Sequence, residues 1–98
     1  MKKLAKLEEV FVGTGEVKGM IFTQIASTND AYLYQVDNNE STHYEVIKRL
    51  DTPLCIDFKN RKYSKTDFKE YYPKANRFGI DGWTFTQLYR AIKKMKEI

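Results

Sequence analysis

The sequence predicts an α+β fold: an antiparallel sheet of three to five strands in a meander, with a C-terminal amphipathic helix packed on one face. Two observations support this class. Between residues 16 and 59 apolar and polar residues alternate in short runs separated by polar turns, and one clear helical pattern closes the chain. Strands followed by a terminal helix are typical of an antiparallel sheet covered on one side.

Size and composition predict one folded domain over residues 1–98. A chain of 98 residues with 42% hydrophobic and 14% aromatic side chains can bury a modest core, and its two prolines and five glycines exclude a disordered or fibrous protein. Internal repeats and low-complexity stretches are not visible.

The first half of the chain is expected to form a three-stranded meander. Residues 1–9 can form two helical turns, since Leu4 and Leu7 would lie on one side. Glycines at positions 13 and 15 are better explained by a tight turn than by a phosphate loop, because a strand and not a helix follows them. Three strands are then expected, at 16–25, 31–36 and 42–49. Polar turn residues separate them, at 27–30 and 37–41.

The second half is expected to add a strand and two helices. Residues 54–59 alternate again, and the neighbouring Pro53 favours a place at the edge of the sheet. Ser64 or Thr66 can cap a short helix that Pro73 ends. The last helix is expected to begin with a capping box from Thr84 to Gln87. Its apolar stripe comprises Phe85, Leu88, Ile92 and Met95.

Enzymatic chemistry finds little support in the residues. One histidine and one cysteine cannot build the usual zinc site, so we expect no metal and no cofactor. A nucleophilic pair of Cys55 with His43 is one alternative. The other is a strand histidine that bonds Glu45, beside a cysteine that serves as a small apolar residue. We expect a protein that is not an enzyme.

The single Cys55 also excludes an internal disulfide, which favours a reducing, cytoplasmic location. The N-terminus lacks the apolar stretch of an export signal, and no run of 18 apolar residues suits a membrane helix. We therefore expect no membrane partner.

Charge is distributed unevenly along the chain. Residues 1–47 hold four basic and seven acidic side chains, whereas residues 48–98 hold thirteen and six. Such an asymmetry predicts a basic face that attracts polyanions. The alternative is that the lysines are simply the solvated surface of the domain.

Basic and aromatic residues alternate between residues 59 and 78. Lysine and arginine neutralise phosphates, and exposed rings stack on unpaired bases. The nucleic-acid-binding candidates are Lys59, Arg61, Lys62, Lys65, Lys69, Lys74 and Arg77, joined by Lys93 and Lys94 on the last helix. The stacking candidates are Tyr63, Tyr71 and Tyr72. The alternative is that these rings fill the core. A further tyrosine group is expected in the core, at Tyr32, Tyr34 and Tyr44.

Several short motifs resemble, in order, those of short uncharacterised proteins of bacteriophages and mobile elements. They are Gly15-Glu16-Val17-Lys18-Gly19, His43-Tyr44-Glu45-Val46, Tyr72-Pro73, Phe78-Gly79 and Trp83. Residues 51–70 depart from that pattern and look like an insertion. The resemblance implies a small accessory protein and assigns no catalytic residue.

Together these observations predict a non-enzymatic accessory protein that binds nucleic acid through its basic C-terminal half. The alternative is a protein-binding factor, either an inhibitor of a host or defence protein or a self-associating subunit that uses an exposed strand edge.

Overall fold

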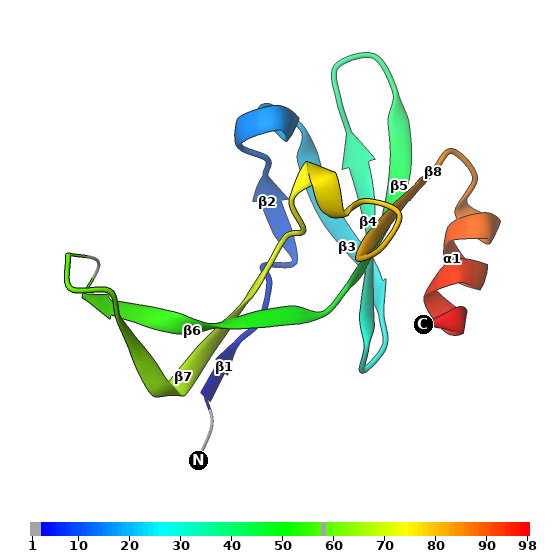
Figure 1. Cartoon of the computed structure of the whole chain (residues 1–98). Helices are drawn as coiled ribbons and strands as arrows, with labels where there is room; N and C mark the ends of the chain where they lie inside the picture. The colour runs from blue at the N-terminus through cyan, green and yellow to red at the C-terminus, as the bar shows by residue number, and fades with distance from the viewer. Residues whose placement is uncertain (1–2, 58) are drawn as a thin grey trace. The chain divides into compact units, whose positions relative to one another are not determined.

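A computed structural model describes residues 3–57 and 59–98. The chain forms two compact units. The first unit consists of Met1–Leu7 and Leu50–Tyr72, and the second of Glu8–Arg49 and Pro73–Ile98. The α+β class is confirmed, but the strands of the described residues belong to two sheets and not to one meander (Figure 1).

The second unit is built on an antiparallel sheet with the strand order β2-β3-β4-β5-β8. These strands are β2 (Val10–Val12), β3 (Ile21–Ser27), β4 (Ala31–Asp37), β5 (Thr42–Lys48) and β8 (Gly82–Phe85). Consecutive pairing of β3, β4 and β5 confirms the expected meander within this sheet. The 3-10 turns η1 (Gly15–Val17) and η2 (Ala75–Arg77) lie in the connections.

Polar turn residues close the two hairpins of this meander. The Thr28 hydroxyl oxygen accepts hydrogen bonds from the N–H groups of Asp30 and Ala31 at 3.2 and 3.0 Å. In the second turn, Asn38 Oδ1 accepts from the N–H groups of Glu40 and Ser41 at 2.9 and 2.8 Å. These bonds satisfy turn amides that have no partner in the strand ladder, which is why the sequence signal at both turns was reliable.

The helix α1 (Leu88–Glu97) packs on one face of this sheet, against β4, β5 and β8, as expected. Its Ala91 and Met95 are buried against Leu33 and Val46. Tyr44 and Phe85 are partly buried beside them.

The other face of the same sheet holds an aromatic cluster. Phe22, Tyr32 and Tyr34 are buried there, and the Phe11 and Phe22 rings stack with centroids 4.6 Å apart. The Tyr34 hydroxyl donates to Glu8 O at 2.7 Å. The core role expected for Tyr32 and Tyr34 is confirmed, whereas Tyr44 contributes to the helix-covered face.

A glycine-rich turn connects β2 to β3. Gly15 and Gly19 have φ values of 62° and 85°, a region that side chains with a Cβ rarely adopt. At Gly13 a Cβ would lie only 2.3 Å from Val17 O. The expected tight turn is therefore confirmed, but it includes η1 and extends to Gly19, so the strand β3 begins at Ile21 and not at residue 16.

The first unit is a three-stranded sheet with the order β1-β7-β6. Its strands are β1 (Lys3–Ala5), β6 (Leu50–Asp57) and β7 (Lys62–Tyr71). The pairing of β6 with β7 is antiparallel, and that of β1 with β7 is parallel. Pro53 lies within β6, opposite Phe68, and β6 is an outer strand, so the expected edge position next to a proline is confirmed.

Two expected helices are absent from the part of the chain that the structure describes. In the described part of residues 1–9, from Lys3 on, the chain forms the strand β1 and no helical turn. Residues 64–71 continue the strand β7 and do not form a short helix. Ser64 does accept hydrogen bonds from the N–H groups of Thr66 and Asp67, at 3.2 and 2.8 Å, but within an irregular part of β7. In both segments, strand pairing outweighs weak helix signals.

The expected capping box is also absent. Thr84 belongs to β8, opposite Glu45, and the helix begins four residues later at Leu88. Gln87 is the residue before the helix and makes no capping bond with its side chain. None of the described helices is long and apolar enough to span a membrane.

Candidate nucleic-acid interface

The net charge of the protein resides entirely in the first unit. Its sequence holds eight basic and four acidic residues, which gives the +4 of the whole chain. The second unit holds nine basic and nine acidic residues and is formally neutral. A field that attracts polyanions is therefore expected around the three-stranded sheet of the first unit.

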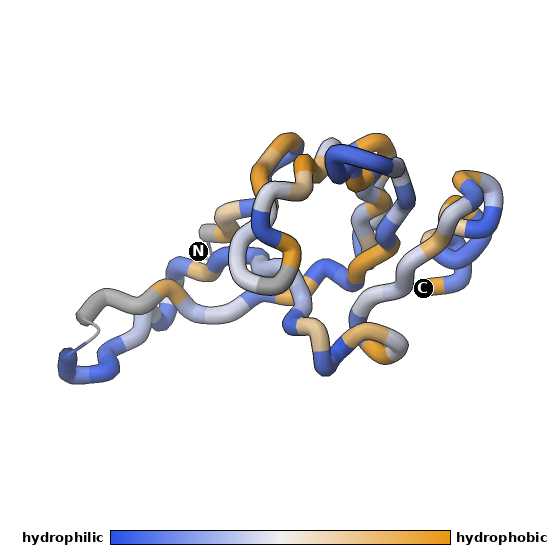
Figure 2. Tube along the Cα trace, turned by 90° about the horizontal axis from the view of Figure 1, so that it is seen from above, coloured by the Kyte–Doolittle hydropathy of each residue, from blue (hydrophilic) through white to orange (hydrophobic). Residues whose placement is uncertain are grey.

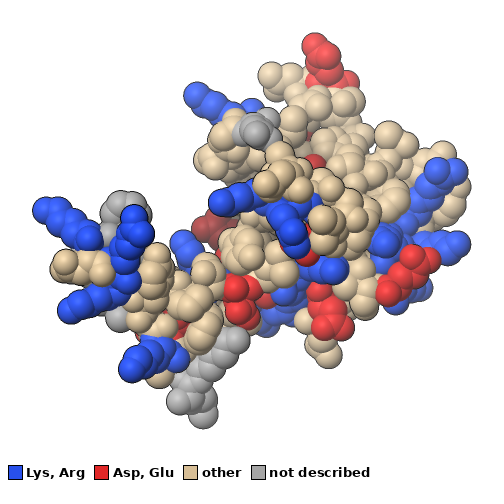
Figure 3. All heavy atoms as spheres, in the orientation of Figure 1, with Lys and Arg blue, Asp and Glu red and all other residues tan. Residues whose placement is uncertain are grey.

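Five of the nine predicted phosphate-binding residues belong to the first unit. Each of them is exposed, and they are Lys59, Arg61, Lys62, Lys65 and Lys69. They follow one another along β7 and the turn that precedes it. Figure 3 shows Lys and Arg side chains extending from this hairpin in several directions.

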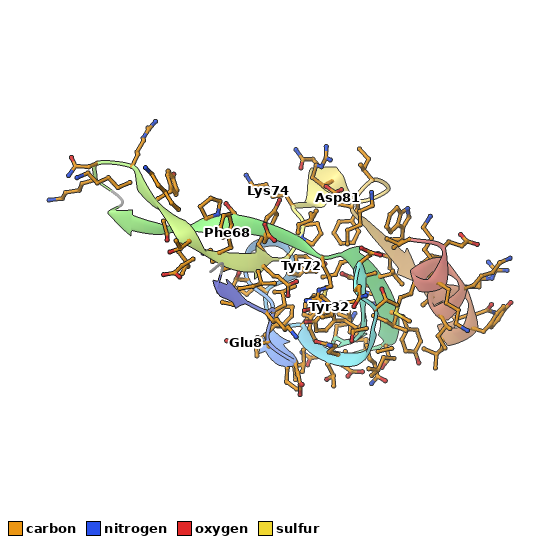
Figure 4. The ribbon with its side chains drawn as sticks, turned by 90° about the horizontal axis from the view of Figure 1, so that it is seen from below. Glu8, Tyr32, Phe68, Tyr72, Lys74 and Asp81 are labelled. Carbon is orange, nitrogen blue, oxygen red and sulfur yellow. The ribbon has the colours of Figure 1, made fainter. Side chains whose placement is uncertain are left out.

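Two of the three stacking candidates are exposed in the same unit. Tyr63 has 55% of its surface exposed and Tyr71 has 39%. Tyr72 is half-buried, as is Phe68, which Figure 4 labels on the hairpin. The alternative that all rings of this segment fill the core is therefore excluded for Tyr63 and Tyr71.

The inner part of β7 is regular and separates its residues onto two faces. From Phe68 to Tyr71 each residue pairs in turn with one residue of β6. Because strand side chains alternate, Lys69 and Tyr71 share the exposed face, and Phe68 and Glu70 share the other. A cation and a ring thus lie two residues apart on one accessible surface.

The outer part of the hairpin is a two-stranded ribbon, which we call the arm and define as residues 55–57 and 59–66. Its ladder pairs are Cys55 with Tyr63 and Asp57 with Lys62, whereas β1 pairs with β7 only from Asp67 to Lys69. In the turn, Arg61 has a φ of 52°, the only positive value of a non-glycine residue in the described part of the chain. Figure 2 shows that the end of the arm is hydrophilic.

The other four predicted residues belong to the second unit. Lys74 and Lys93 are exposed there. Arg77 donates from Nε to Asp81 Oδ2 at 2.7 Å, and the ammonium group of Lys94 lies 4.2 Å from the centroid of the Trp83 ring. Figure 4 labels Lys74 and Asp81 in the segment between β7 and β8. The predicted set of nine is thus divided between two units, and Arg77 and Lys94 interact with side chains of their own unit.

His43 interacts with Glu45, which is one of the two alternatives that the sequence left open. Its Nε2 lies 3.0 Å from Glu45 Oε2, on the same strand. The side chain of Cys55 lies outside the part of the chain that the structure describes. Among the side chains that the structure describes, no three metal-ligating groups come together at one point.

An exposed apolar row on the second unit was not predicted. Val10, Val12 and Ile21 all have exposed side chains, and Val12 pairs with Ile21 across β2 and β3. The signal was present, because Val10 and Val12 alternate around Phe11 as they do in a strand. The N-terminal segment with Lys6 also belongs to the charged unit, which the interpretation of residues 1–9 as helical turns did not indicate.

Comparison with known proteins gives no match: no protein-family model, no curated protein and no solved structure is similar to this chain.

Proposed function

We propose that this protein is a non-enzymatic accessory protein that binds nucleic acid through its first unit. The observation that carries the proposal is the concentration of the whole net charge in that unit, beside two exposed tyrosines. Cations that neutralise phosphates release condensed counterions, and this release favours binding without any pocket. The contacts proposed are those of Lys59, Arg61, Lys62, Lys65 and Lys69, with Tyr63 and Tyr71 as stacking groups.

The four cations of the second unit have a secondary place in this proposal. Lys74 and Lys93 remain candidate phosphate contacts, whereas Arg77 and Lys94 already interact with Asp81 and Trp83. The context implied by the resemblance, an accessory protein of a phage or mobile element, belongs to the same proposal.

Salt dependence of oligonucleotide binding tests the proposal. With a labelled oligonucleotide, the logarithm of the association constant should fall linearly with the logarithm of salt concentration. The double variant Lys62→Ala/Lys65→Ala should reduce the slope by about two, at close to one unit for each lost phosphate contact. Lys96→Ala, an exposed residue of the neutral unit, removes one charge and should leave the slope unchanged. Lack of binding at low salt to both single and double strands would refute the proposal.

A second candidate function is supported by the apolar row of Val10, Val12 and Ile21. It lies on the outer strand β2 and its neighbour β3, where a protein partner or a second copy could cover it. Light scattering coupled to size-exclusion chromatography tests self-association. A dimer that persists at high salt, and that is monomeric in the variant Val12→Lys, would support self-association through this row. A monomer under all conditions would exclude self-association, and the row would then have to bind a different protein.

A further inference from the structure

The shape of the arm indicates which nucleic acid the first unit would bind. A two-stranded ribbon that is not flanked by a third strand is marginally stable in water. The sequence of the arm, residues 55–57 and 59–66, nevertheless holds four cations against one acid. A marginal element with this charge gains stability when polyanionic groups surround it.

Dimensions of the arm match one groove of a duplex. Packed sheets lie about 10 Å apart, which is the thickness of a ribbon with its side chains. The major groove of B-DNA is about 12 Å wide and about 8.5 Å deep, whereas the minor groove is about 6 Å wide. From Cys55 to the turn, β6 extends about 10 Å at roughly 3.3 Å per residue, so the turn can reach the groove floor.

A cation and a ring lie on opposite faces of the arm. Lys62 and Tyr63 are neighbours in the strand and therefore point to opposite faces, while Arg61 lies in the turn. A single-stranded nucleic acid that lies on a β-sheet contacts only one face of the sheet. A duplex groove presents phosphates on both sides of a protein ribbon that enters it. Figure 3 shows the basic side chains projecting to different sides of the hairpin.

Arg61 adds an independent observation. A backbone with a φ of 52° favours glycine or asparagine, and other residues adopt it at a cost. A long cationic side chain at this position is expected where the side chain has a role that outweighs the strain. At the end of an arm in the major groove, its guanidinium would reach the O6 and N7 acceptors of guanine.

We infer that the arm enters the major groove of B-form DNA, with Arg61 at the groove floor and Lys62 and Lys65 against the phosphates. This inference rests on the proposed function and specifies its ligand. Duplex RNA would bind more weakly, because its major groove is deep and narrow.

Chemically modified duplexes test the inference with the full-length chain. Four labelled ligands of one sequence are compared by fluorescence anisotropy: duplex DNA, single-stranded DNA, duplex RNA, and duplex DNA with glucosylated 5-hydroxymethylcytosine. The glucose fills the major groove without changing the charge. A fifth duplex, with 2,6-diaminopurine in place of adenine, adds an amino group to the minor groove as the matched control.

Binding to the plain and diaminopurine duplexes should be equal. Binding to the glucosylated duplex and to duplex RNA should be at least tenfold weaker. Arg61→Ala should weaken binding to the plain duplex at least threefold and leave binding to the glucosylated duplex unchanged, with an unaltered far-UV circular dichroism spectrum.

Each contrary result has a distinct meaning. Equal affinity for plain and glucosylated duplexes would overturn the inference and leave the proposed function intact. Tighter binding to the single strand would also overturn it, in favour of stacking on Tyr63 and Tyr71. Failure to bind any of the five ligands would overturn both the inference and the proposed function.

Discussion

The carboxylate of Glu70 accepts a hydrogen bond from the backbone N–H of Leu7, with Oε1 and N 3.0 Å apart. Glu70 is buried on β7, and Leu7 lies two residues after the end of β1. This bond connects the two separate stretches of sequence that make up the first unit.

Removal of this carboxylate should destabilise the first unit. In Glu70→Ala the N–H of Leu7 loses its acceptor, which costs about 1–3 kcal/mol for a partly buried donor. Urea denaturation, followed by circular dichroism, measures the loss. Glu40→Ala changes the same residue type at an exposed turn and should stay within about 0.5 kcal/mol of the parent protein. Equal effects of the two substitutions would show that the bond to Leu7 contributes nothing.

Substitution of Arg61 by glycine should separate stability from binding. Glycine adopts a positive φ without strain, so Arg61→Gly is expected to preserve or raise the free energy of unfolding, by up to about 1 kcal/mol. The same variant loses a phosphate or base contact and should bind duplex DNA more weakly. Thermal unfolding and fluorescence anisotropy measure the two quantities. Opposite signs are the expected result, and a parallel loss of both would mean that Arg61 stabilises the turn itself.

The hydroxyl group of Tyr34 should contribute measurably to the second unit. It is fully buried and donates to Glu8 O at 2.7 Å, so Tyr34→Phe is expected to cost about 1 kcal/mol. The exposed Tyr89→Phe is the matched control and should change the unfolding free energy by less than about 0.5 kcal/mol. An unchanged unfolding midpoint for Tyr34→Phe would contradict the expectation.

Asp37 should make stability depend on pH in the acid range. Hydrogen bonds from the Thr42 hydroxyl, at 2.5 Å, and from the Gln35 amide lower the pKa of Asp37 below its usual value. Because the folded-state pKa is lowered, the stabilisation is present above the unfolded pKa of about 3.8 and is lost as the pH falls through the folded value.

Nuclear magnetic resonance titration of the Asp37 carboxyl group measures this directly. In Thr42→Ala the pKa of Asp37 should return toward the usual carboxyl value. The difference in unfolding free energy between the two proteins should then disappear at the lowest pH. A pKa that Thr42→Ala does not change would contradict the assignment to this hydroxyl.

The meander of the second unit could be predicted from the sequence because its determinants are local. Thr28 and Asn38 close the turns through bonds to residues two and three positions away. The division into two units depends on pairing between residues far apart, such as Lys3 with Asp67. No local pattern reports such a pair, and the three-residue strand β1 is too short for a periodic signal. Residues 51–70 depart from the motifs that resemble phage proteins, and this whole segment lies in the first unit.

Candidate site residues could be found by residue type, but their grouping could not. The sequence indicates the cations and rings of residues 59–78 without saying which are accessible. Exposure of Tyr63 but not of Tyr72 depends on packing within the folded unit. The chain crosses from the first unit to the second between Tyr72 and Pro73, and this boundary separates Lys69 from Lys74.

Pro53 has a consequence for how copies of this protein would behave when crowded on one ligand. A proline has no N–H, so a neighbouring chain cannot extend the outer strand β6 with an uninterrupted ladder. Protein molecules that bind side by side along a nucleic acid reach high local concentrations. Under this condition unprotected edge strands pair with one another. The proline on β6 opposes the growth of fibres through this edge. It therefore favours separate protein molecules that bind the ligand reversibly.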